Sequence, residues 1–295
     1  MKTNNITALT SRIESFPTLP AVVNRVMEIT SDPESSANEL MNVIGPDIAL
    51  TASILKLANS AFFGLTKKVS SLQQAITVLG FKEIRNMIIT KAVFDSFNHL
   101  KKEENFDIRG FWEHSFLCGL ASKIIATDLN RESNEFFVAG LIHDIGKLVI
   151  YLALPLEYSK LATVASPLYF TDYKTEKTAL GIAHDEVGMR LLKRWLFPES
   201  LVNVVGFHHR IHELENKSPS LIVVHVADLL AHIADPCVSE GEGQPCFSAE
   251  TLYPEIITLA KPYGIRWNES DLHRFQCQLA ESREKEAAML NLFYQ

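Results

Sequence analysis

One stretch of the sequence sets a carboxylate beside an imidazole in apolar surroundings. Residues 138–148 read VAGLIHDIGKL, so His143 and Asp144 follow a run of small and aliphatic residues, and Lys147 comes within one turn. Burying these two groups together costs free energy unless a cation or a hydrogen-bond network compensates them. A metal ion would compensate both. For an isolated pair, however, a core histidine beside a capping aspartate would be the ordinary interpretation.

The pair is not isolated, because other lone polar residues stand on separate apolar helices of the predicted fold. They are His114, His184, His208 or His209, and Asp228. Each has an ordinary alternative: a solvated helix start for His184, a surface corner for His208 and His209, and an ion pair one turn along its own helix for Asp228. One shared ion would satisfy these scattered groups together. Nitrogen and oxygen ligands without a thiolate suit zinc, iron, manganese, cobalt or nickel, and magnesium where carboxylates dominate.

The elements that must position these groups are helices, because apolar residues recur at helical spacing and rarely alternate as in half-buried strands. The expected helices cover residues 21–31, a short helix capped by Ser35 or Ser36 with Glu39 in its first turn, a helix capped by Asp47 over 48–59, a helix through 75–79, then 81–97, 111–129, a helix holding His143 and Asp144, then 156–164, 175–180, 184–195, 201–207, a helix opened by Ser220 that contains His225, Asp228 and His232, and 271–293. Charged residues 101–105 form the first expected boundary, and the Gly- and Pro-containing loop 236–245 forms the second.

Composition bounds the class of protein. With 295 residues, of which 47% are apolar, the chain can bury one large core or two moderate ones. A net charge of -7 argues against a broad basic surface for nucleic acid. Four cysteines without CxxC or zinc-finger spacing suit a reducing compartment. The N-terminus lacks the apolar core of a signal peptide and the apolar windows are interrupted, so we expect a cytoplasmic protein without a membrane span.

The order of the polar residues carries a family resemblance. A His, then His-Asp, then two further His and a late Asp resemble the HD superfamily of metal-dependent phosphohydrolases. Other motifs resemble one branch of it, the HDOD (HD-related output domain) proteins of bacterial signal transduction. These motifs are Pro17-Thr18-Leu19-Pro20, residues 48–57 leading into Ala58-Asn59-Ser60, Ala75-Ile76 with Leu79-Gly80, and the run from Gly188 to Leu192 with Trp195. The resemblance covers about residues 14–235.

This resemblance implies a metal centre and its ligands. The implied ligands are His114, His143, Asp144, His184, His208 and Asp228, with Asp144 bridging two ions and His209 as the alternate to His208. One or two divalent ions of iron, manganese, zinc, nickel or magnesium are expected. Lys147 would lie near a bound phosphate or another anion. No catalytic residue is assigned, and Lys147 and Asp144 are the candidates if the chain is an enzyme.

Two departures separate this chain from the cyclic-di-GMP phosphodiesterases of the superfamily. Those enzymes have a His-His-Glu start and a Gly-Tyr-Pro signature, whereas this chain reads His208-His209-Arg210 and has no Gly-Tyr-Pro. Gly110 stands one turn before His114, where the three-metal members of that branch place a Glu. We therefore do not expect a cyclic-dinucleotide phosphodiesterase.

Two functional hypotheses remain. The favoured one is a bacterial regulatory output module that retains a metal site and acts through a signalling protein partner, since HDOD proteins are regarded as modules without established catalysis. The alternative is a metal-dependent phosphohydrolase acting on a nucleotide or another phosphate ester. We expect an all-α fold, with a helical bundle at residues 1–104 packed on an HD-type core at 105–235, and a helical extension at 236–295. No nucleic-acid-binding motif is evident.

Overall fold

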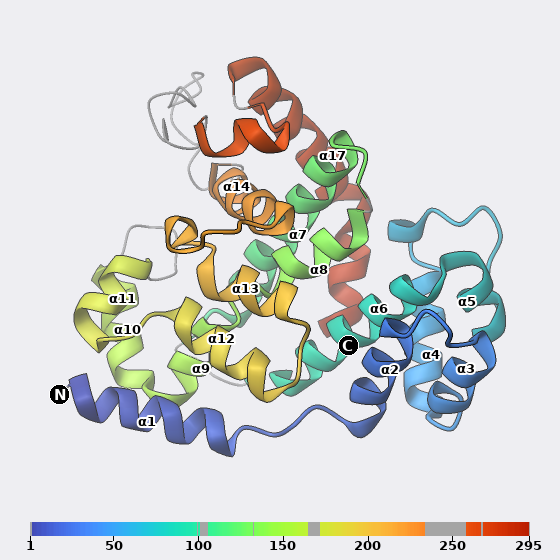
Figure 1. Ribbon diagram of the computed structural model, residues 1–295, viewed down its shortest axis with the longest axis horizontal. Helices are drawn as coiled ribbons and strands as arrows, with labels where there is room; N and C mark the ends of the chain where they lie inside the picture. The colour runs from blue at the N-terminus through green and yellow to red at the C-terminus, as the bar shows by residue number, and fades with distance from the viewer. Residues whose placement is uncertain are drawn as a thin grey trace. The chain divides into compact units, whose positions relative to one another are not determined.

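The structure is a computed structural model that describes residues 2–98, 100, 106–131, 133–164, 172–233, 258–266 and 268–294. Helices dominate these residues and no strand occurs among them (Figure 1). The predicted all-α fold is confirmed. Contacts divide the chain into unit 1, residues 1–16 with 100–281, and unit 2, residues 17–99 with 282–295.

The helices of each unit follow the chain order. Unit 1 contains α1 (Lys2–Ser15), α7 (Ile108–Asp128), α8 (Ser133–Ile142), α9 (Gly146–Ala153), α10 (Pro155–Val164), α11 (Tyr173–Leu180), α12 (His184–Arg194), α13 (Glu199–Phe207), α14 (Pro219–Ile233) and the larger part of α17 (Glu269–Tyr294). Unit 2 contains α2 (Ala21–Ser31), α3 (Ala37–Ile44), α4 (Ile48–Ala58), α5 (Leu72–Leu79) and α6 (Phe81–Ser96). Short 3-10 turns cover Ala61–Phe63, Ile211–Glu213 and Lys261–Tyr263.

Local signals account for the helix ends of unit 2. Ser36 accepts a hydrogen bond from the backbone N–H of Glu39, whose side chain accepts one from the backbone N–H of Ser36, so the pair forms a capping box at the start of α3. Asp47 caps α4 as predicted. The side chain of Asn59 donates a hydrogen bond to the carbonyl oxygen of Val69 and accepts one from the backbone N–H of Val69. These bonds give Asn59 a structural role at the end of α4.

Helix α1 was not among the predicted helices. It packs on α9, α11 and α12 within unit 1. Its apolar residues Leu9 and Ile13 are buried, and the ring of Phe16 lies edge-on to Trp195 with centroids 5.8 Å apart. Contacts therefore group residues 1–16 with unit 1, whereas the sequence placed them in the bundle of residues 1–104. The predicted boundaries at residues 104 and 235 lie outside the described residues, as do loop 236–245 and residues 246–257 of the extension, so the three-part division stays a prediction.

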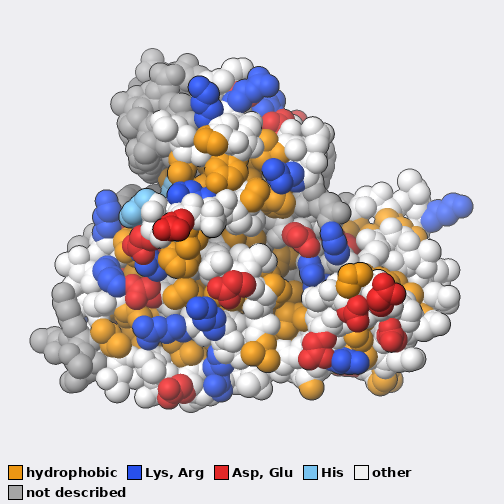
Figure 2. Space-filling view, in the orientation of Figure 1, with side chains coloured by type: hydrophobic (Ala, Val, Ile, Leu, Met, Phe, Trp, Pro, Cys, Tyr) orange, Lys and Arg blue, Asp and Glu red, His pale blue; other side chains and the backbone are white. Residues whose placement is uncertain are grey.

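The core of unit 1 is built on α7, which packs against both α8 and α14, while α12 packs on α9 and α13. Residues 134–153, covering most of α8 and all of α9, are apolar and long enough to cross a membrane, but 83% of the most apolar 18-residue window within them is buried inside the fold. The helices α7, α8, α12, α13 and α14 thus form the frame that surrounds the His143-Asp144 pair. On the face shown in Figure 2, acidic and basic side chains are interspersed, and the described residues form no broad basic surface there.

Candidate metal centre

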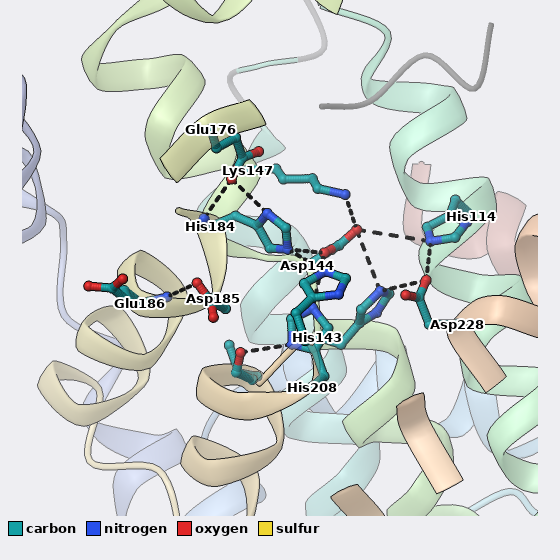
Figure 3. A network of polar contacts seen from close by, with 12 residues as sticks. His114, His143, Asp144, Lys147, Glu176, His184, Asp185, Glu186, His208 and Asp228 are labelled. Atoms are coloured by element: carbon teal, nitrogen blue, oxygen red, sulfur yellow. Dashed lines mark hydrogen bonds and ion pairs between the residues drawn. The ribbon is translucent and has the colours of Figure 1, made fainter. Parts of the chain in front are cut away.

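His143 and Asp144 lie in a turn between two buried helices. Helix α8 ends at Ile142 and α9 begins at Gly146, so the expectation of one helix running through the pair is wrong. Both side chains lie in the core, where His143 is fully buried and Asp144 is 1% exposed. The turn brings the imidazole and the carboxylate to one side of the helix pair, toward the other candidate ligands (Figure 3).

A close approach of α12 to Gly146 brings His184 to Asp144. A Cβ atom on residue 146 would lie 1.9 Å from the carbonyl oxygen of His184 and 2.7 Å from the backbone nitrogen of Gly188. Only glycine allows two backbones to come this near. Since α12 begins at His184, the contact places His184 Nε2 at 3.1 Å from Asp144 Oδ1.

The two oxygens of Asp144 face two groups of imidazoles. Oδ1 lies 3.1 Å from His184 Nε2 and 3.6 Å from His208 Nε2. Oδ2 lies 3.5 Å from His143 Nε2 and 3.9 Å from His114 Nε2. A carboxylate placed between two donor groups has the geometry required to bridge a pair of metal ions.

Asp228 on α14 completes the group around Asp144 Oδ2. Its Oδ1 lies 3.1 Å from His114 Nε2 and 3.4 Å from His143 Nε2. Nδ1 of His232, one turn later, lies 3.2 Å from the same oxygen. The ion pair within α14 that the sequence allowed is therefore present, and Asp228 faces the other ligands as well. His232 was not predicted as a ligand, although its ring nitrogen lies within 4.8 Å of the ligand atoms of His114 and Asp228.

Both histidines of the His208-His209 pair reach the centre. His209 Nε2 lies 3.0 Å from His184 Nε2, and ligand atoms of Asp144 and the three histidines lie within 4.8 Å of one another. His184 and His208 have no exposed surface. A solvated helix start for His184 and a surface corner for His208 are therefore wrong.

Carbonyl acceptors determine which ring nitrogen faces the centre. Nδ1 of His143 donates to the carbonyl oxygen of Gly140 at 2.7 Å, and Nδ1 of His208 donates to that of Val205 at 2.9 Å. Because Nδ1 carries a proton in each ring, Nε2 is the nitrogen available to a metal.

Glu176 on α11 has the same role for His184 and was missed from the sequence. Glu176 is fully buried, and its Oε2 accepts hydrogen bonds from Nδ1 and from the backbone N–H of His184, both at 2.7 Å. A carboxylate behind a metal-binding imidazole orients the ring and makes it more basic. Glu176 precedes His184 by eight residues across a turn, and no helical spacing signals that contact.

Polar atoms at the middle of the cluster lack hydrogen-bond partners on the protein. They are the buried atoms His143 Nε2 and His208 Nε2, whereas Asp144 Oδ1 lies at ion-pair distance from His184 Nε2. Leaving a buried polar group unpaired costs about 1–3 kcal/mol. A divalent ion would take these atoms as ligands, and imidazole nitrogen with carboxylate oxygen is a donor set that such ions accept. The residues therefore fit a divalent metal ion.

Burial and neighbouring charges shift the pKa values within the cluster. Burial lowers the pKa of His184, but Glu176 and Asp144 outweigh it and raise that pKa to about 9. Burial raises the pKa of Asp144, but His143 and Lys147 outweigh it and hold that pKa well below its usual value. Asp144 is thus ionised at neutral pH, and protonated imidazoles balance it together with the Lys147 ammonium.

Lys147 contacts Asp144 directly, with 2.6 Å between Nζ and Oδ2, and it is 5% exposed. Its predicted place beside a bound anion stays a prediction. The side chains of His114 and His232 are 13% and 34% exposed, and His209 is half-buried. The cluster is therefore partly accessible at these three histidines.

Solved structures with the same fold are known. A structure from Shewanella amazonensis SB2B, named as a candidate phosphohydrolase, matches with a TM-score of 0.72 and 22% identity over 97% of this chain and 98% of that chain. A candidate signal transduction protein from Marinobacter aquaeolei VT8 matches with a TM-score of 0.67 and 18% identity, over 100% of this chain and 66% of that chain. At these identities, the likeness shows the fold alone.

Sequence comparison assigns the chain to a family. An uncharacterized protein from Treponema pallidum (strain Nichols) is 22% identical over 231 residues, which are 77% of this chain but 44% of that protein. This chain thus spans less than half the length of that relative. The family pattern of the HDOD domain matches residues 16–211, which include the turn with His143 and Asp144 and the helices that bring His114, His184 and His208 to it. The chain belongs to the HDOD family.

Proposed function

We propose that this chain is a regulatory HDOD module whose core holds divalent metal ions and which acts through a signalling protein partner. The observation that carries the metal centre is the convergence of buried imidazoles on the two oxygens of Asp144, together with the Nε2 atoms of His143 and His208, which make no hydrogen bond. The name of the Marinobacter aquaeolei protein supports the signalling role. The burial of the cluster supports a centre that stabilises the module rather than one that turns over substrate.

The cluster offers two positions for an ion. His184, His208 and His209 would hold one ion together with Asp144 Oδ1. His114, His143 and Asp228 would hold the other together with Asp144 Oδ2. Bound ions would supply the positive charge that buried carboxylates need, and they would tie α7, α12, α13 and α14 to the turn after α8.

A metal-dependent phosphohydrolase is the second candidate, because the donor set is complete and a buried ammonium adjoins it. The Shewanella amazonensis protein is named as a candidate phosphohydrolase. In such enzymes, a pair of ions activates water and stabilises a phosphoryl oxygen. In this chain, Lys147 would neutralise a phosphate oxygen, and the ester would approach from the side of His114 and His232. The substrate would be a nucleotide or another phosphate ester.

The two candidates differ in turnover. The purified chain, loaded in turn with zinc, iron, manganese, nickel, cobalt and magnesium, is assayed against a panel of phosphodiesters and nucleotides. A variant carrying His143→Ala and Asp144→Ala serves as the control. We expect bound metal and no hydrolysis above the control. Hydrolysis that the double variant loses would replace the regulatory proposal with the enzyme.

A further inference from the structure

A buried thiol lies beside the second ion position. Sγ of Cys118, a ring nitrogen of His143 and a carboxylate oxygen of Asp228 lie within 4.8 Å of one another. All three residues are buried, with Cys118 and His143 fully buried and Asp228 5% exposed. The sequence pattern predicted nitrogen and oxygen ligands only, because no cysteine has a metal-binding spacing to another.

Helix α7 brings Cys118 to this position together with a predicted ligand. Residues four apart on a helix lie on the same face, so Cys118 follows His114 one turn along α7. Helix α7 packs against α8 and α14. His143 directly follows the end of α8, and Asp228 lies within α14. His114 is on the more exposed side, and Cys118 is one turn deeper.

A buried cysteine alone is usually an apolar core residue. The second observation here is His143, whose buried Nε2 makes no hydrogen bond and lies 3.4 Å from Asp228 Oδ1, while its Nδ1 donates to the carbonyl of Gly140. An imidazole nitrogen, a carboxylate oxygen and a thiol sulfur within 4.8 Å of one another form a donor set for a metal ion.

We propose that Cys118 binds the ion on the Asp228 side as a thiolate, together with His143 and Asp228. The inference rests on the metal centre of the proposed function and adds a sulfur ligand to it. On binding, the S–H proton passes to solvent and a metal–sulfur bond forms. Because thiolate is a soft ligand, it favours zinc, cobalt or iron at this position over magnesium or manganese.

Cobalt(II) gives the first test. The full chain is titrated with cobalt, and absorption is followed in the visible region, which reports cobalt binding, and in the near ultraviolet, where thiolate-to-cobalt charge transfer absorbs. A variant with Cys237→Ser, Cys246→Ser and Cys277→Ser keeps Cys118 as the only cysteine and is the matched control. We expect the ultraviolet band in the wild type and in this variant, and its loss when Cys118→Ser is added.

Zinc affinity should also fall with Cys118→Ser. Loss of a residue that only hydrogen-bonds to a metal ligand lowers affinity roughly 10- to 100-fold, and we expect loss of a ligand to cost at least as much. A second measurement is X-ray absorption of the zinc-loaded variant that keeps Cys118 as its only cysteine. Because this variant has no change at the site, the measurement shows whether sulfur binds zinc even if Cys118→Ser does not fold. We expect a sulfur scatterer at about 2.3 Å beside nitrogen and oxygen at about 2.0–2.1 Å. Cobalt or zinc bound without sulfur would overturn the role of Cys118 and leave the metal centre standing. No binding of either ion would overturn the metal centre itself.

Discussion

The contact between Gly146 and α12 gives a sharp test of how the centre is assembled. In Gly146→Ala, the new Cβ would lie 1.9 Å from the carbonyl oxygen of His184, whereas ordinary contact begins at 3.4 Å. The start of α12 must therefore move by about 1.5 Å, and both partners are backbone, so no side chain can absorb the shift. Metal ligands tolerate about 0.2 Å of displacement, so His184 would leave its position beside Asp144.

We expect Gly146→Ala to cost about 1–3 kcal/mol of stability through overpacking and to weaken zinc binding by roughly 10- to 100-fold or more. Urea unfolding measures the first effect and titration calorimetry the second. Gly264→Ala is the control, because its φ of +82° makes alanine cost about 1–2 kcal/mol while no candidate ligand is involved. Zinc affinity should be unchanged there. Zinc affinity equal to that of the wild type in Gly146→Ala would show that the close contact at Gly146 does not position His184 for metal binding.

Three further predictions concern the charges of the cluster. Glu176→Gln should lower metal affinity roughly 10- to 100-fold, because the amide orients His184 but no longer makes it more basic; calorimetry that shows no change would contradict this. Asp144→Asn should abolish metal binding, and by leaving the Lys147 ammonium buried without its carboxylate it should cost about 3–5 kcal/mol in urea unfolding. A stability within error of wild type would exclude that ion pair as a buried contact. The pKa of His184 is raised to about 9 from its ordinary 6.5, so the ring is protonated at pH 7 and must lose a proton to bind metal. Calorimetry in buffers of different ionisation enthalpy should show proton release that declines as pH rises through about 9, and constant release across that range would contradict the assignment.

Much of the fold follows from local signals. The capping box of Ser36 and Glu39, the cap at Asp47 and the helical spacing of apolar residues depend on neighbours in the sequence, and the structure has them as expected. The candidate site could be predicted from the sequence by an energetic argument, because a buried His or Asp on an apolar helix needs a hydrogen-bond, ionic or metal partner. The structure brings the predicted residues together, while their role as metal ligands stays a proposal.

The features missed from the sequence depend on contacts between distant segments. The break after Ile142 accompanies the approach of α12 to Gly146, and nothing within residues 138–148 indicates it. Glu176 reaches His184 across a turn, and Cys118 meets His143 only through packing of α7 on its neighbours. Helix α1 has a mainly polar sequence. Its few apolar residues indicate a buried helix face only when its packing on α9, α11 and α12 is known.

Diffraction at a metal absorption edge can locate the two ions that we propose on either side of Asp144. Crystals of the chain grown with zinc or manganese should show two anomalous peaks about 3.5–4 Å apart. One peak should contact His184 and His208, and the other should contact His143 and Asp228. Anomalous density elsewhere, or none at the edge of a metal present in excess, would rule out a metal centre at Asp144.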